Sequence, residues 1–151
     1  MRFVFFLILM CLPLAGCSWD RSARIEAGTS QPQFTFTNLG RFIGSNPEPV
    51  CATRVSMHQN ERIVWEIFVP IESTDEAPKC KTIADIRYGE VPTGFMQSVP
   101  PEYLRENTPY ELRFDNLGEY PRSGRRAFCL NEDREAVDVR FDSGRPSSCE
   151  D

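Results

Sequence analysis

The stretch IVWEIFV, residues 63–69, is the segment from which the fold can be predicted. Ile63, Trp65, Ile67 and Val69 alternate along it and would share one face of an extended chain. Because successive side chains of a β-strand point to opposite faces, this period of two predicts a half-buried strand. Such a strand needs partner strands beside it and an apolar layer over its buried face.

The same alternation recurs on both sides of this stretch. It appears in FTFT (34–37), YELRFD (110–115) and VDVRFD (137–142), and further candidate strands are CATRVSM (51–57), KTIADIRYG (81–89) and RRAFCL (125–130). Turn residues, among them Ser123-Gly124, fall between these runs. About seven short strands without a convincing helical stretch predict an all-β fold, a small antiparallel β-sandwich over residues 34–151. This layout is similar to that of immunoglobulin-like and fibronectin type III domains, a resemblance of architecture that does not imply a function.

The N-terminal residues have the features of a secretory signal. Arg2 precedes ten apolar residues, FVFFLILMCL (3–12), which are too few to span a bilayer as a helix. The following Leu14-Ala15-Gly16-Cys17 resembles the lipobox of bacterial lipoproteins. That resemblance implies a signal peptide over residues 1–16, an acylated Cys17 as lipid anchor, and a place in the bacterial cell envelope. An ordinary signal peptide with a cysteine after its cleavage site is the alternative.

The resemblance also implies which membrane holds the protein, and the sequence after Cys17 predicts how the domain is connected to it. Ser18 follows Cys17, and in Gram-negative lipoproteins an aspartate there would favour the inner membrane, so serine favours the outer membrane facing the periplasm. Residues 18–33 are polar and interrupted by Gly28 and Pro32. We therefore predict that residues 17–33 form a lipidated N-terminus and flexible tether.

Four cysteines remain once Cys11 leaves with the signal and Cys17 carries lipid. They are Cys51, Cys80, Cys129 and Cys149. In an oxidising compartment an even number predicts two disulfides, for which three pairings exist. The shorter loops favour Cys51 with Cys80 and Cys129 with Cys149. A four-cysteine zinc site would normally contain a close pair such as C-x-x-C, which this sequence lacks, so we expect no metal.

The charge balance excludes some classes of partner. Without Arg2 the mature chain has 16 basic and 22 acidic side chains, a net charge of −6. This charge argues against nucleic acid and against electrostatic binding to anionic lipids.

The sequence also argues against catalysis and against a cofactor. It contains one histidine, His58, which we expect in an exposed loop, and none of the common nucleophile, zinc, phosphate or calcium motifs. The alternative is a cell-wall-directed enzyme or small-ligand binder whose carboxylates gather in a cleft. The candidates are Glu61, Glu66, Asp75, Glu76, Asp85 and Glu90.

Two segments are candidates for binding a protein partner. VPTGFMQSVPPEYL (91–104) places Phe95, Met96 and Tyr103 in a proline-stiffened connection, although Phe95 and Met96 would instead cap the core if they fold inward. The segment EYPRSGRR (119–126) contains Arg122, Arg125 and Arg126, which could together bind an acidic partner. The alternative interpretation of this segment is a solvated turn. The sequence therefore predicts a non-catalytic protein-interaction, structural or immunity/inhibitor module of the envelope.

Overall fold

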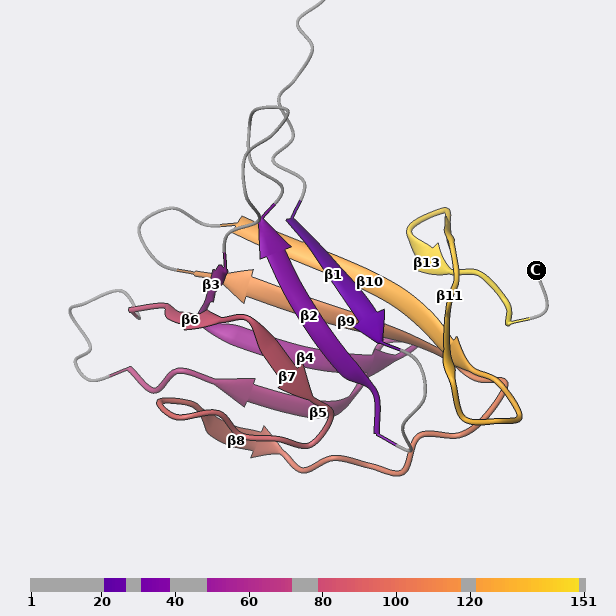
Figure 1. Ribbon diagram of the computed structural model, residues 1–151, viewed down its shortest axis with the longest axis horizontal. Coiled ribbons are helices and arrows are strands. Elements are labelled where there is room, and N and C mark those ends of the chain that lie inside the picture. The colour runs from indigo at the N-terminus through magenta and orange to yellow at the C-terminus, as the bar shows by residue number, and fades with distance from the viewer. Residues whose placement is uncertain (1–20, 27–30, 39–48, 72–78, 118–121, 150–151) are drawn as a thin grey trace, which may run out of the picture.

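The computed structural model describes residues 21–26, 31–38, 49–71, 79–117 and 122–149. Over these ranges the chain forms thirteen β-strands and no helix, which confirms the all-β prediction (Figure 1). The number of strands exceeds the seven expected. Several strands have only two or three residues, too few for a period of two to be recognised in the sequence.

The larger sheet has six antiparallel strands. Their order across the sheet is β11 (Ala136–Asp138), β10 (Arg122–Leu130), β9 (Pro109–Asn116), β4 (Arg54–Gln59), β5 (Arg62–Phe68) and β8 (Met96–Val99). Trp65 and Ile67 of β5 are fully buried, as the alternation predicted. A register shift between Met57 and His58 of β4 changes the pattern, so that Val64 is buried as well and Ile63 only partly. Such a shift is typical of a β-bulge, which places one extra residue in a strand.

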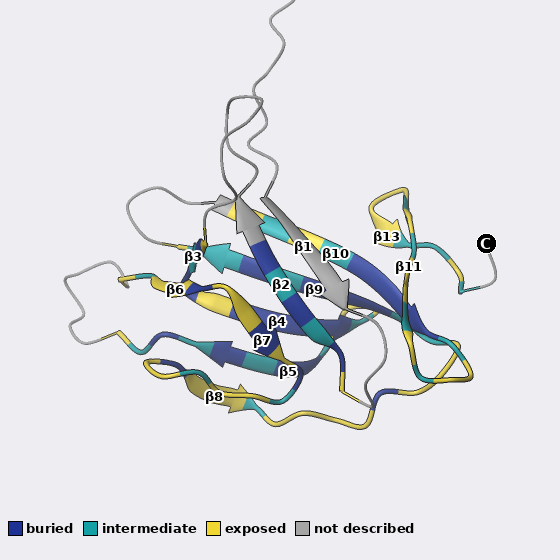
Figure 2. Ribbon diagram, viewed as in Figure 1, coloured by how far each residue is buried: buried dark blue, intermediate teal, exposed yellow. Residues whose placement is uncertain are grey.

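A second sheet covers one face of the first. It has three strands, β1 (Arg21–Glu26), β2 (Gln33–Asn38) and β7 (Asp85–Arg87), in the order β1-β2-β7. Phe34 and Phe36 of β2 meet Phe128 and Phe114 of the large sheet, with ring centroids 5.7 and 5.0 Å apart. The buried residues lie between the two layers, which is the arrangement of a β-sandwich (Figure 2).

The tether prediction is wrong for residues 21–26. This segment forms β1, which pairs with β2 over six residues from Arg21 opposite Asn38 to Glu26 opposite Gln33. Backbone hydrogen bonds to β2 hold β1 in place. Such bonds do not depend on the side chains, from which the tether was predicted. Residues 17–20 and 27–30, including Cys17, lie outside the described residues.

Two short strand pairs complete the structure, and each is tied by a disulfide. β3 (Val50–Ala52) pairs with β6 (Lys81–Ile83), and Cys51 is bonded to Cys80 with their Cα atoms 5.4 Å apart. β12 (Phe141–Asp142) pairs with β13 (Arg145–Pro146), and shortly after it Cys149 is bonded to Cys129 of β10, Cα to Cα 5.7 Å. The favoured cysteine pairing is therefore confirmed. In the part of the chain that is described, no helix has the length and hydrophobicity to cross a membrane.

Candidate functional site

The outer face of the six-stranded sheet, which β2 does not cover, carries polar side chains. On β9 the buried Tyr110, Leu112 and Phe114 alternate with Glu111, Arg113 and Asp115, as predicted from the sequence. Across the strand pair, Ser56 of β4 lies opposite Arg113 and His58 lies opposite Glu111. The exposure of this face differs from the expectation, because Glu111 is only 2% exposed.

The C-terminal hairpin β12–β13 contacts this polar face. The Cys129–Cys149 disulfide returns the chain end to β10, and Ser143 and Gly144 form the hairpin tip with φ angles of 49° and 85°. Two left-handed residues make the tight turn that a two-residue hairpin needs. The guanidinium of Arg125 lies 4.1 Å from the ring centroid of Phe141 and donates a 3.2 Å hydrogen bond to the Gly144 carbonyl. The hairpin is therefore held to the sheet by a disulfide and by an arginine.

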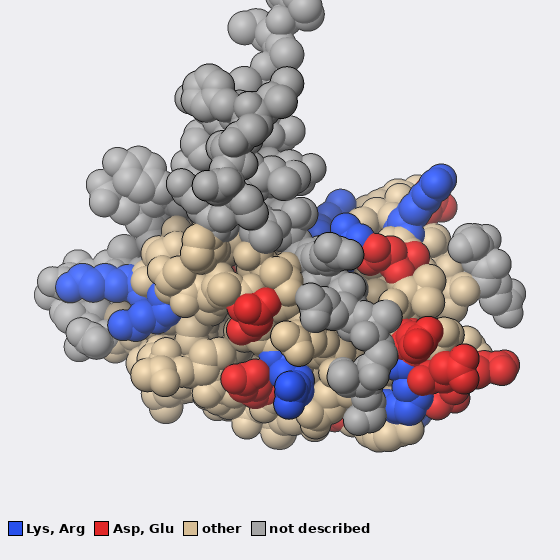
Figure 3. Space-filling view, in the orientation of Figure 1, with Lys and Arg blue, Asp and Glu red and all other residues tan. Residues whose placement is uncertain are grey.

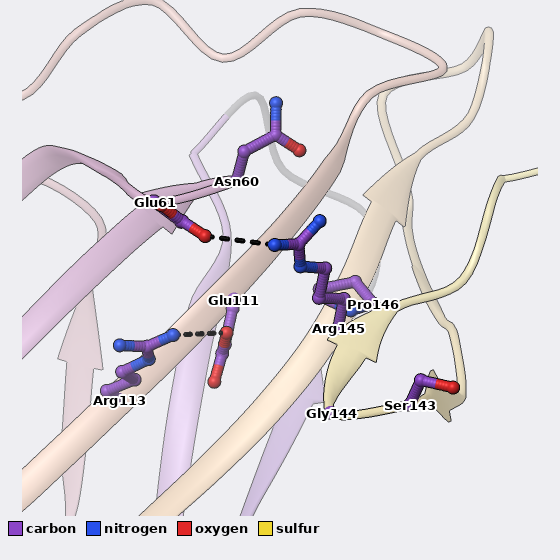
Figure 4. Close-up of a pocket in the computed structure, with 8 residues that line it drawn as sticks. All are labelled: Asn60, Glu61, Glu111, Arg113, Ser143, Gly144, Arg145 and Pro146. Carbon is purple, nitrogen blue, oxygen red and sulfur yellow. Dashed lines mark hydrogen bonds and ion pairs between the residues drawn. The ribbon is translucent and has the colours of Figure 1, made fainter.

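A cleft of about 470 Å³ lies between the hairpin tip, the β4–β5 turn and the outer face of β9 (Figure 4). We call it the Glu111 cleft. It is lined by Asn60, Glu61, Glu111, Arg113, Ser143, Gly144, Arg145 and Pro146. Its volume falls within the range of about 300 to 1,000 Å³ that is usual for small-molecule sites. On the face shown in Figure 3, basic and acidic side chains of the described residues lie next to one another at the centre and right, and basic side chains alone lie at the left edge.

Two arginine–glutamate pairs line the cleft, one partly buried and one exposed. In the partly buried pair, Arg113 Nη2 donates to the buried Glu111 Oε2 at 2.8 Å, and this bond raises the pKa of Arg113. In the exposed pair, Arg145 Nη2 donates to Glu61 Oε1 at 3.1 Å, with both side chains more than four-fifths exposed. Glu111 Oε1 is buried and accepts no hydrogen bond from the described residues; the Arg125 guanidinium nitrogen is 4.0 Å away. One carboxylate oxygen of the cleft therefore lacks a donor.

His58 and Ser56 form a buried pair on the same face. His58 Nε2 lies 2.9 Å from Ser56 Oγ, and burial together with the charge of Arg113 lowers the pKa of His58. The expectation of an exposed loop histidine is wrong, because β4 extends through His58 to Gln59 and pairs His58 with Glu111 of β9, where His58 is 8% exposed. Ser56 is 3% exposed, so its hydroxyl is not presented to a substrate. Within the described ranges, no three histidine, cysteine or acidic side chains are grouped as a metal site would require.

The aromatic segment 91–104 is divided between core and surface. Phe95 is 7% exposed and belongs to the hydrophobic core, so its prediction as a partner-binding residue is wrong. A turn in which the Phe95 amide donates to the Pro92 carbonyl directs this ring inward, where burial of an aromatic side chain is favourable. Met96 and Tyr103 are 53% and 76% exposed.

The three arginines of segment 119–126 do not form one group. Arg125 contacts the C-terminal hairpin, whereas Arg126 is ion-paired with Asp138 of β11. Neighbouring residues of a strand point to opposite faces, and these two lie in β10 rather than in a turn. The side chain of Arg122 lies outside the described residues.

The predicted carboxylates are also dispersed, and Glu61 is the described member of that set that lines the cleft. Glu66 accepts a 2.6 Å hydrogen bond from Ser98, Asp85 accepts one from Thr35, and Glu90 accepts one from the Arg87 amide. Asp75 and Glu76 lie outside the described residues. Sequence reasoning missed Glu111 and Arg145, since Glu111 reads as the solvent side of a strand. The predicted disulfide between Cys129 and Cys149 was the feature of the sequence from which the return of the C-terminal segment to the sheet could have been inferred.

Comparison of the chain with protein-family models, curated proteins and solved structures gives no match. The interpretation of the site therefore depends on its own geometry and chemistry.

Proposed function

We propose that this chain is a non-catalytic lipoprotein of the bacterial envelope that is anchored through acylated Cys17 and binds a protein partner. A structural accessory and an immunity or inhibitor protein are two forms of this function. The lipobox-like Leu14-Ala15-Gly16-Cys17 supports the anchor and the envelope location, preferably the outer membrane. Both described disulfides are in keeping with an oxidising compartment such as the periplasm.

The observation that carries the proposal is the exposed edge of the large sheet. We call residues 91–103 the edge segment. It contains β8, the last strand of the six-stranded sheet, whose outer side pairs with no other strand among the described residues. Val91, Met96 and Tyr103 of this segment are 43%, 53% and 76% exposed. An open strand edge with exposed apolar side chains offers backbone hydrogen bonds and contact area to a partner.

Neighbouring side chains hold Tyr103 in place. Arg134 donates a 2.6 Å hydrogen bond to the Tyr103 hydroxyl and lies 4.7 Å from the ring centroid. The preceding residue is also fixed, because the buried Tyr88 hydroxyl donates to the Glu102 carbonyl at 2.8 Å. Tyrosine and arginine are enriched among residues that dominate protein–protein binding, and prior ordering lowers the entropy lost on association.

The arrangement of carboxylates supports binding rather than hydrolysis. A glycosidase-like mechanism needs one carboxyl group that gives a proton to the leaving oxygen. Glu61 and Glu111 instead each accept a hydrogen bond from an arginine. The enzyme alternative therefore gains no support from the cleft.

The anchor and β1 together limit the distance between the domain and the membrane. Arg21, the first residue of β1, is four positions after Cys17, and a fully extended chain spans at most about 14 Å over four positions. An acylated Cys17 would therefore hold the sandwich close to the bilayer, and a partner would be another component near the same membrane.

Crosslinking in intact cells tests the proposal. The full-length protein serves as bait, and wild type is compared with a Met96→Ala plus Tyr103→Ala double variant. The control is Val137→Ala, which truncates an apolar side chain of similar exposure to Met96 (49% against 53%) in β11 at the opposite edge of the sheet. We expect one dominant crosslinked protein that the double variant loses and the control retains. Absence of a partner, or a partner unaffected by the double substitution, would refute the proposal.

A further inference from the structure

Two exposed apolar side chains, Ile71 and Leu117, lie at the same end of the large sheet. They are 62% and 49% exposed. Thr53 links the two chain segments, because its hydroxyl accepts a 2.9 Å hydrogen bond from the Leu117 amide and its carbonyl accepts one of 2.8 Å from the Val69 amide. Ile71 is two residues after Val69. Neither apolar side chain belongs to the edge segment, so the proposed protein partner does not account for their exposure.

Both lysines of the sequence, Lys79 and Lys81, lie at this end as well. Lys81 of β6 is opposite Ala52 of β3, the residue before Thr53, and both lysines are exposed. Among the described residues, basic side chains alone lie at the edge of the visible face where β6 is found (Figure 1, Figure 3). We call Ile71, Lys79, Lys81 and Leu117 the lysine end. Apolar side chains with lysines beside them are typical of surfaces that lie in the interface of a bilayer, where the ammonium groups reach the lipid headgroups.

The acylation site joins the domain at the same end. Arg21 begins β1 four positions after Cys17 and pairs with Asn38, the last residue of β2. An aromatic contact of 5.0 Å joins β2 to β9 two residues before Asn38 and three residues before Leu117, and both strands end on the same side of the molecule (Figure 1). An acylated Cys17, at most about 14 Å from Arg21, therefore holds the lysine end toward the bilayer.

From these observations we infer that the lysine end docks on the phospholipid surface of the membrane that carries the anchor. Ile71 and Leu117 enter the interfacial region, and the lysine ammonium groups donate to lipid phosphates. The inference rests on the proposed acylation of Cys17, because the short connection keeps this end at a high effective concentration next to the lipid. The net negative charge of the mature chain does not prevent docking, since charges more than about 10 Å away are largely screened by salt.

Docking at the lysine end leaves Tyr103 of the edge segment away from the lipid. β2 runs from Gln33 to Asn38, roughly 17 Å at the usual rise of a strand. Tyr103 lies toward the Gln33 end of this strand, because it lines a cavity together with Gln31. The docked domain therefore has a fixed orientation in which Tyr103 stays accessible to a protein partner.

Quenching of tryptophan fluorescence by brominated lipids tests the docking. The acylated protein is reconstituted into vesicles of phosphatidylcholine and phosphatidylglycerol, in a Trp19→Phe background that leaves the buried Trp65 as a constant signal. Leu117→Trp places a reporter in the lysine end. Val137→Trp is the matched control, because Val137 is also 49% exposed and lies near the other end of β10. Urea denaturation of each variant verifies that it is folded.

We expect the bromines to quench at least about half of the fluorescence added by Leu117→Trp, because an interfacial side chain enters the lipid by about 5 to 10 Å. The fluorescence added by Val137→Trp should change by less than about a tenth, since this reporter stays outside the lipid. Lys81→Glu in the Leu117→Trp background should lower the ratio of docked to undocked protein at least about fivefold, the effect of one basic residue near an anionic surface. The same charge reversal at the exposed Arg105, two residues after Tyr103, should leave the ratio unchanged.

Three results would overturn the docking: equal quenching of the two reporters, no quenching of Leu117→Trp in acylated protein, or an unchanged ratio in the Lys81→Glu variant. Each of them leaves the proposed function standing, since the acyl chains are measured separately by intact mass and the partner by crosslinking. A mature protein whose mass shows no acyl chains would instead overturn the proposed anchor, and the docking with it.

Discussion

Replacing Gly124 by alanine should destabilise the sandwich, because the added methyl group has no space. Gly124 of β10 lies opposite Phe114 of β9, and an alanine Cβ would stand 2.2, 2.6 and 2.8 Å from three atoms of the Phe114 ring. The ring cannot easily move away, since it packs edge-on against Phe36 at 5.0 Å and both side chains are buried. Either the ring must leave its preferred rotamer or β9 and β10 must separate.

We expect a loss of about 3 kcal/mol in the free energy of unfolding, the upper end of the usual range for overpacking a core. For a domain of this size such a loss lowers the melting temperature by roughly 6 to 12 °C. The measurement is urea denaturation under non-reducing conditions, followed by the fluorescence of the buried Trp65 and analysed by linear extrapolation.

Two further variants decide whether the clash is the cause. Phe114→Leu removes ring atoms, so in the Gly124→Ala background it should restore at least about 1 kcal/mol, a coupling that a double-mutant cycle measures. Gly144→Ala is the control: no atom lies within 4 Å of its Cβ, and only the backbone strain at φ +85° opposes it. That strain amounts to about 1 to 2 kcal/mol. Simple additivity of the Gly124 and Phe114 effects would refute the argument.

Other predictions concern the disulfide, the histidine, the tyrosine and the anchor. Replacing Cys129 and Cys149 by serine opens a 20-residue loop and should lower stability by about 3 kcal/mol in urea denaturation; a loss below 1 kcal/mol would contradict the chain-entropy argument. Because the pKa of His58 is lowered in the folded state, the unfolded state binds more protons, so the stability present above pH 6.5 should decrease as the pH falls through the folded pKa. His58→Gln should flatten that decrease, and an unchanged profile would show that other groups produce it. Tyr88→Phe removes the hydroxyl that contacts the carbonyls of Glu102 and Val64 and should lower stability by about 1 kcal/mol, whereas a neutral effect would mean that water replaces it. Cys17→Ala should abolish incorporation of labelled fatty acid, and continued labelling would overturn the lipobox interpretation.

The longer strands could be predicted because each has one buried and one polar face. In β9, Tyr110, Leu112 and Phe114 alternate with polar residues over its full length, and in β5 the alternation around Trp65 indicated the correct buried face. Each buried position of a strand requires an apolar side chain, so burial can be recognised from the local sequence as an alternation of apolar and polar residues. The β-bulge at Val64 of β5 is not recorded in this way, because it depends on the register with β4.

Features that depend on non-local pairing could not be predicted. Ser123-Gly124 has the composition of a turn, but Gly124 lies within β10, where its missing side chain makes room for the Phe114 ring. Glycine serves in turns and also where another group approaches the backbone closely, and the local sequence does not distinguish the two. In the same way β1 is held by its pairing with β2, and the polar segment that contains it shows no sustained period of two.

The candidate site was missed for a related reason. Glu111 alternates with apolar residues as a solvent-facing side chain would, yet it is buried beside a hairpin that begins thirty residues later in the chain. The cleft therefore exists only where the C-terminal segment lies against the sheet, and the Cys129–Cys149 bond is the covalent link that holds it there. Two short strands, each of two residues, could not secure a hairpin by backbone hydrogen bonds alone. A site whose wall is tied by a disulfide is favoured in an oxidising compartment, where such bonds are retained. The structural requirement of the Glu111 cleft thus agrees with the envelope location proposed on the separate ground of the residues around Cys17.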